Sequence, residues 1–215
     1  MNVDRPMDDP VYIVTDIEAD GPRPGEHSMI AFASVAVTAG GNVLGEFEAV
    51  LSPLSGAAVD PETTAWWRMQ PEAWAAANDN PRPAETVMAD FVRWVSGFER
   101  GRVFTANPAS FDGMWIDFYL KRFTRHALLQ GPYANGRLFD GPGLCLKSYC
   151  SALTGLPTWR CGPRDLPPAW LGEHEHTHRA IDDARGYAHL LGVLMGARPD
   201  LFTPPPQAFA AISQA

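Results

Sequence analysis

The chain has 215 residues, of which 46% are apolar and 20% are charged, a composition typical of a globular protein long enough for one sizeable α/β domain. Its formal net charge of −8 excludes a protein that coats duplex DNA with a basic surface, but not an enzyme that holds a few nucleotides through bound cations. A polar N-terminus without a secretory signal, three cysteines without a CxxC pair, and the lack of an apolar run of about 18 residues predict a reduced, cytoplasmic chain with no membrane span.

The first half of the chain predicts three strands followed by three helices. Runs of apolar and β-branched residues indicate the strands, and Gly40-Gly41 is typical of a tight hairpin between the second strand and the third. Proline at the start of a helix and apolar residues three or four positions apart indicate the helices. The predicted elements are strands at 11–17, 29–38 and 42–51, a helix that begins at Pro61, and helices at 71–77 and 84–98.

The second half predicts strands and helices around a long loop. The predicted elements are strands at 102–106 and 137–140, helices at 111–123, 144–153 and 179–196, and a surface loop rich in Pro, Gly and Trp at 154–172. We find no internal repeat and no domain boundary, so we expect a single domain over 1–215. Its core is expected at 11–196, between a loose arm at 1–10 and a Pro-rich tail at 197–215. The element order predicts an α/β fold, a mixed β-sheet flanked by α-helices.

Two acidic residues, Asp16 and Glu18, stand at the end of the first predicted strand. In a β-strand, residues i and i+2 point to the same face, so the two carboxylates are expected side by side. Like charges held together repel each other, and a bound divalent cation is the usual compensation. The pair therefore predicts a metal site at the carboxyl end of the strand.

Three further polar residues extend this pair. Asp112 follows the strand at 102–106, at the entry to a helix, and Asp183 lies one turn into the last helix. His178 precedes Asp183 by five residues, or about 500° of helical rotation, so the two side chains would not align on a straight helix. We therefore expect His178 in the loop that leads into the helix, where it can approach the same site.

Four carboxylates and one imidazole are suited to the hydrolysis of a phosphodiester. All-oxygen ligation favours Mg²⁺ or Mn²⁺ over Zn²⁺, and two such ions offset a charge of about −4. Two ions about 3.5–4 Å apart can activate a water and stabilise the leaving oxygen, while an imidazole with a pKa near 6.5 can take the proton. The expected metal ligands are Asp16, Glu18, Asp112 and Asp183, and the expected base is His178.

Three segments resemble the motifs of the DEDDh 3′–5′ exonucleases, which belong to the ribonuclease-H-like superfamily. They are Thr15-Asp16-Ile17-Glu18, the segment from Asn107 to Asp112, and His178-Arg179-Ala180-Ile181-Asp182-Asp183-Ala184, in the order of the family's three motifs. The resemblance covers about residues 11–196. It implies a ribonuclease-H-like fold, two Mg²⁺ or Mn²⁺ ions, hydrolysis from a 3′-OH end, and often a homodimer. It also implies that His178 is the general base and Asp183 the last metal ligand.

A fourth segment resembles one branch of this family. The Trp66-Trp67 pair, with threonines just before it and Gln70 after it, is similar to a string in the RNase T- and RNase AS-like exoribonucleases. The resemblance implies that the substrate is the 3′ end of single-stranded RNA and that the products are nucleoside 5′-monophosphates. A DNA exonuclease of the same family remains an alternative, because no residue that would read the 2′-OH can be named.

Two alternatives come from other classes of protein. A nucleic-acid-binding module with this fold and no activity is disfavoured because all five site residues are present. A zinc hydrolase is suggested by His174, Glu175 and His178, which form an HExxH string. That string needs both histidines on one face of a helix, and the prolines and glycine upstream argue against a helix. We therefore expect His174 and His176 in solvent or near the substrate end of the site.

Aromatic side chains are the candidates for stacking on bases, a contact worth roughly 1–3 kcal/mol per base. Trp66, Trp67 and Phe111 are the expected aromatic contacts, with one of the two tryptophans facing the site. The chain has seven tryptophans, so at least one of this pair could instead lie in the core. His27 and Arg23, in the loop after the first motif, are expected to reach a terminal nucleotide.

Overall fold

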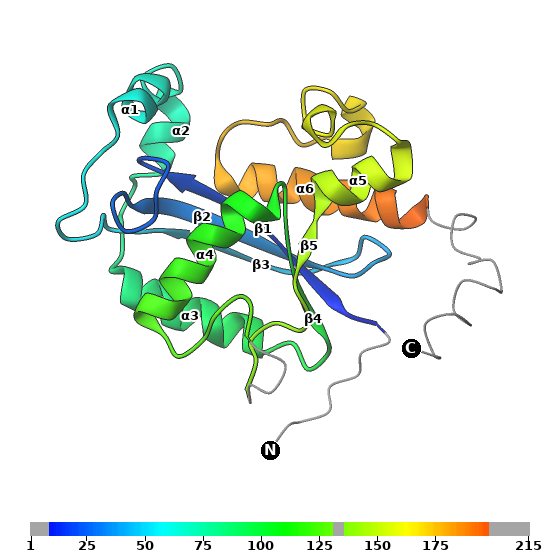
Figure 1. Cartoon of the computed structure of the whole chain (residues 1–215), viewed down its shortest axis with the longest axis horizontal. Coiled ribbons are helices and arrows are strands. Elements are labelled where there is room, and N and C mark those ends of the chain that lie inside the picture. Colours follow the sequence, from blue (N-terminus) through cyan, green and yellow to red (C-terminus); the bar gives the residue numbers. More distant parts are fainter. Residues whose placement is uncertain (1–8, 131–135, 198–215) are drawn as a thin grey trace, which may run out of the picture.

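The computed structural model describes residues 9–130 and 136–197, and a five-stranded sheet lies at its centre (Figure 1). The strands in spatial order are β3 (Val43–Val50), β2 (Met29–Val37), β1 (Val11–Ala19), β4 (Arg102–Ala106) and β5 (Leu144–Cys145). The central strand β1 pairs antiparallel with β2 and parallel with β4. The sheet is therefore mixed, as predicted.

Helices cover both faces of the sheet (Figure 1). One face is covered by α3 (Ala84–Ser96) and α4 (Ala109–Phe123), and the other by α5 (Leu146–Thr154) and α6 (Ala180–Gly196). The buried positions of α3 recur every three or four residues, which is why this segment forms an amphipathic helix. The α/β class and the flanking helices expected from the sequence are confirmed.

The side chains of β1 alternate between the two helical layers. Ile13 and Ile17 pack into the apolar cluster that includes α3 and α4, whereas Val14 packs into the cluster that includes α5 and α6. Asp16 and Glu18 occupy positions of the same parity as Val14, so they point to the α6 side of the sheet. The alternation thus directs both carboxylates toward one helical layer.

Two short helices, α1 (Pro61–Trp67) and α2 (Pro71–Ala76), lie at the end of the sheet where β1 finishes (Figure 1). Trp67 is 3% exposed and packs with Ala31 of β2. Its indole N–H donates to the carbonyl oxygen of Ala19 at 2.9 Å. This bond ties α1 to the last residue of β1, next to the two carboxylates.

The prediction of a strand at 137–140 is wrong. The fifth strand of the sheet is β5, which pairs parallel with β4. Leu138 and Phe139 are 1% and 3% exposed, and they join the first apolar cluster from an irregular segment. The backbone N–H of Asp140 donates to the carbonyl oxygen of Arg102 at 2.7 Å. The apolar pattern of this segment correctly indicated that it is buried. A segment held by isolated hydrogen bonds can be buried without forming a strand.

The loop predicted at 154–172 is only partly a surface feature. It contains two 3₁₀ turns, η1 (Thr158–Arg160) and η2 (Pro168–Leu171), and its Cys161 and Leu166 are buried in the second apolar cluster. These buried residues lie at irregular intervals between prolines and glycines, so they produce no helical or strand periodicity. The segment therefore contributes to the core that it forms with α5 and α6, although its sequence is typical of a loop.

The remaining predicted elements are confirmed, with boundaries within two residues of the expected ones. Most of the predicted arm at 1–10 and tail at 197–215 lies outside the described residues. Within the described ranges, no helix has the length and apolar character needed to cross a membrane.

Candidate active site

The carboxylates of Asp16 and Glu18 lie at the carboxyl end of β1. Glu18 is 8% exposed, and Asp16 is partly buried. The pairing of β1 with β2 becomes irregular directly after Glu18, where the chain leaves the sheet. The two acidic side chains therefore project from the last regular positions of the central strand.

Asp112 and Asp183 reach the same region from two helices. Each lies in the first turn of its helix, Asp112 in α4 and Asp183 in α6, and they are 3% and 4% exposed. One carboxylate oxygen from each of Asp16, Glu18 and Asp183 lies within 4.8 Å of the others. Asp112 lies close enough for its charge to raise the pKa of Asp16. The four predicted carboxylates thus come together.

Burial and mutual repulsion raise the pKa values of Asp16 and Glu18, and burial raises that of Asp112. For Asp16 and Glu18 the larger cause is the loss of solvent, and the charges of the other acids add to it. Burial raises the pKa of Asp112 to about 7, although the N–H groups of Asp112 and Ile17 and the charge of Lys147 oppose the shift. Together the carboxylates form an all-oxygen donor set of the kind that divalent cations occupy.

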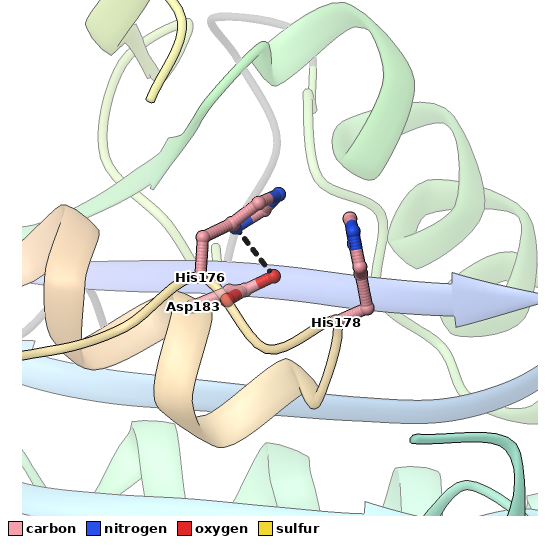
Figure 2. A group of neighbouring side chains, drawn as sticks. All are labelled: His176, His178 and Asp183. Atoms are coloured by element: carbon pink, nitrogen blue, oxygen red, sulfur yellow. Dashed lines mark ion pairs between the residues drawn. The ribbon is translucent and has the colours of Figure 1, made fainter. Parts of the chain in front are cut away.

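Two histidines lie beside Asp183 (Figure 2). His176 places Nδ1 2.8 Å from Oδ2 of Asp183, and its ring centroid is 4.4 Å from that of His178. His178 precedes α6, as predicted, with a φ of 60° in the left-handed region that non-glycine residues seldom adopt. The N–H of Thr177 donates to Oδ1 of Asp183 at 3.1 Å, so the histidine segment is anchored to the helix start.

The predicted substrate contacts fall into two groups. Trp66 is partly exposed and packs edge-on against His178, with 4.9 Å between ring centroids, and Phe111 is 41% exposed at the start of α4. Trp67 and His27 are each 3% exposed, and the His27 ring packs against the backbone at Gly21. As a correction to the expectation from sequence, Trp67 and His27 have no exposed ring face for a base. Of the four predicted rings, Trp66 and Phe111 remain as candidate contacts.

His176 lies beside Asp183, whereas from the sequence it was expected in solvent or near the substrate end of the site. The signal that could have found it is the i, i+2 spacing of His176 and His178, which the HExxH pattern obscured. The segment 174–178 is not helical, so the helical geometry that the HExxH string requires is not formed. His174 is exposed and belongs to neither group of potential metal ligands found in the described residues.

The fold and the acidic site at the end of its central strand are those of a metal-dependent 3′–5′ exonuclease. Residues 11–195 match the family described as the 3′-5′ exoribonuclease Rv2179c-like domain. The chain belongs to this family. No curated protein is significantly similar to it.

Solved structures with a similar fold include several 3′-exonucleases. A 3′-exonuclease described in 3′-end-specific recognition of a histone mRNA stem-loop has 12% identity and a TM-score of 0.63, covering 90% of this chain and 84% of its own. The nuclease domain of 3′hExo, a DEDDh family member bound to rAMP, has 11% identity and a TM-score of 0.61, covering 86% and 92%. Exonuclease I of E. coli, in complex with a dT13 oligonucleotide, has 17% identity and a TM-score of 0.62, covering 89% and 42%. At these identities the likeness establishes the fold.

Proposed function

We propose that the chain removes nucleotides from the 3′ end of single-stranded RNA and releases nucleoside 5′-monophosphates. The observation that carries the proposal is the group of buried carboxylates at the end of β1 with His178 beside it. In this reaction water adds to the terminal phosphorus, the bond to the 3′ oxygen of the preceding nucleotide breaks, and that oxygen takes a proton. The residues of the site must therefore hold the phosphate, accept a proton from water and keep the terminal nucleotide in place.

Two Mg²⁺ or Mn²⁺ ions fit the donor set that the carboxylates offer. The donors are oxygens, which these hard cations prefer, and cations would offset the repulsion that raises the pKa values of Asp16 and Glu18. When bound, such ions supply activation of the water and stabilisation of the leaving oxygen. The ligands we propose are Asp16, Glu18, Asp112 and Asp183.

His178 is the general base in this proposal. Burial, and then the neighbouring His176, lower its pKa, so the imidazole is neutral at pH 7 and has a lone pair that can accept the proton of water. Trp66 packs edge-on against the His178 ring, with 4.9 Å between ring centroids. The base is thus held beside the carboxylates before substrate arrives.

Trp66 and Phe111 are the proposed contacts for the terminal bases. Both rings are at least partly exposed, and each stands next to a residue of the carboxylate and histidine group. Single-stranded nucleic acid commonly binds through stacking on such rings. The description of the family as exoribonucleases favours RNA, whereas the proteins of similar fold include one bound to dT13 as well as one bound to rAMP.

The test compares matched RNA and DNA single strands that carry a 5′ label and either a free or a blocked 3′ end. We expect the free RNA strand to shorten stepwise with Mg²⁺ or Mn²⁺, and to yield nucleoside 5′-monophosphates. A chelator and a blocked 3′ end should each stop the reaction. Faster shortening of DNA would overturn the assignment of RNA, and no shortening of either strand would indicate a binding module without activity.

The homodimer implied by the family resemblance is part of the same proposal. Its test is the molar mass in solution, measured by light scattering on the full chain of 23.5 kDa. A mass near twice this value supports the dimer, and the mass of one chain over the assayed concentration range contradicts it.

A further inference from the structure

The segment 174–178 holds three histidines, of which the proposed hydrolysis uses only His178. His176 is the second of these to lie at the site, where its Nδ1 is 2.8 Å from Oδ2 of Asp183 (Figure 2). One ligand atom from each of His176, His178 and Asp183 lies within 4.8 Å of the others. This nitrogen-rich group shares Asp183 with the all-oxygen group formed with Asp16 and Glu18.

We propose that His176, His178 and Asp183 form a site for Zn²⁺ that inhibits the enzyme. Two imidazole nitrogens and one carboxylate oxygen are ligands that Zn²⁺ binds well, whereas Mg²⁺ prefers oxygen and keeps several waters. A site with three protein ligands leaves one position of a tetrahedron for water or for an oxygen of the substrate. The two groups of ligands around Asp183 therefore differ in the metal they select.

The geometry requires small adjustments to close around the ion. With Zn–N and Zn–O distances of about 2.0–2.2 Å, tetrahedral ligand atoms are about 3.3 Å apart. The contact between His176 and Asp183 must widen slightly from 2.8 Å, and the other separations, at most 4.8 Å, must adjust to the same value. Rotation of the histidine side chains supplies these shifts. The His176 side chain is 29% exposed, so the site is open to an incoming ion, and the Asp183 side chain is 2% exposed at its base.

Inhibition follows from the two shared residues, and this consequence rests on the proposed function. A zinc ion bound here occupies the lone pair with which His178 accepts a proton, and it takes Asp183 away from the carboxylate group. Both effects act on hydrolysis at once. The binding of zinc itself depends only on the geometry of the three side chains.

The experiment measures the zinc Kd by isothermal titration calorimetry in excess Mg²⁺, on the full chain and on three variants. His176→Asn removes a ligand of the zinc site, His174→Asn is a matched change in the same segment outside it, and Asp16→Asn alters the carboxylate group alone. We expect one Zn²⁺ per wild-type chain and a zinc Kd at least about tenfold weaker for His176→Asn. Mutation of a residue that only hydrogen-bonds a metal ligand already lowers metal affinity by about tenfold or more, and His176 is itself a ligand. His174→Asn should bind zinc as the wild type does, and Asp16→Asn should still bind one Zn²⁺ per chain.

A wild-type chain that binds no zinc, or a His176→Asn chain with an unchanged Kd, would overturn the proposal. Thermal unfolding shows whether His176→Asn is folded, and cobalt(II) in place of zinc reports the coordination by its visible absorption. Strong absorption of a four-coordinate ion supports the site, and the weak absorption of a six-coordinate ion contradicts it. Failure of the proposed function has a separate signature: the wild-type chain with Mg²⁺ would then leave RNA unshortened, whatever the zinc Kd.

Discussion

Replacing Asp16 by asparagine separates the two effects of its carboxylate, one on activity and one on stability. Asn keeps the size and shape of the side chain and removes its charge. If the carboxylate holds metal, Asp16→Asn should lower RNA hydrolysis by several orders of magnitude. At the same time it should raise the stability of the metal-free protein at pH 8, because it removes a charge that repels Asp112, Glu18 and Asp183.

The size of the stability effect follows from the geometry. Ligand oxygens of Asp16, Glu18 and Asp183 lie within 4.8 Å of one another. Two unit charges at that distance repel by about 3–4 kcal/mol at an effective dielectric constant of 20. Partial protonation and side-chain rotation relieve part of this energy, so we expect a gain of about 2 kcal/mol. For a chain of this size, that gain raises Tm by about 4–8 °C.

The assay is thermal unfolding in a chelator and again in excess Mg²⁺, with RNA shortening measured on the same samples. Mg²⁺ should raise the Tm of the wild type by more than that of Asp16→Asn, because the variant has lost a ligand. Asp182→Asn is a matched control. The Asp182 carboxylate accepts from the hydroxyl of Thr177 at 2.9 Å and pairs with Arg179 and Arg185, so its loss should lower Tm slightly or leave it unchanged.

Two results would refute the reasoning about Asp16. A lower Tm for Asp16→Asn in the chelator would mean that the carboxylate stabilises the fold. Hydrolysis by Asp16→Asn at a rate comparable to the wild type would mean that the carboxylate is not a metal ligand required for the reaction.

Three further predictions concern the base, the buried acids and the substrate contact. His178→Ala should lower kcat by about 10²–10⁴ while Mn²⁺ binding and Tm stay near wild-type values, and a rate within a few-fold of the wild type would exclude His178 as the base. The folded-state pKa of Asp112, about 7, lies above the ordinary 3.8, so its ionisation above pH 7 costs stability. In a chelator, unfolding free energy should therefore rise by about 2–3 kcal/mol between pH 8 and pH 5, and Asp112→Asn should lose this rise; equal slopes for the two proteins would contradict the shift. Trp66→Ala should raise the KM for RNA by about 5- to 100-fold with little change in Tm, whereas truncation of the buried Trp67 to Ala should lower stability by about 3–5 kcal/mol. An unchanged KM for Trp66→Ala would remove that residue from the substrate site.

Local patterns were sufficient to predict most of the elements and the residues of the carboxylate group. The two-residue repeat of a strand places Asp16 and Glu18 on one face whatever lies around them. Likewise, the 3.6-residue repeat of a helix shows that His178 and Asp183 cannot align on one straight helix, so a loop before the helix was the remaining position for His178. Such inferences hold because they depend on neighbours within a single element.

Contacts between separate elements could not be predicted from such local patterns. The burial of Leu138 and Phe139 in an irregular segment, and of Cys161 in a loop, depends on which surfaces the sheet and helices leave uncovered. The choice between the two tryptophans depends on the rotation of α1 against β2, which buries Trp67 and turns Trp66 toward His178. A repeat in the sequence carries no information about that rotation.

From the sequence alone came the identity and order of five polar residues and the elements that bear them. The tertiary structure alone decided that His176, rather than His174, meets Asp183, because that contact depends on how the segment before α6 folds back on the helix start. Periodicity describes neighbours along one element, whereas the approach of separate elements is set by packing and by bonds between distant residues.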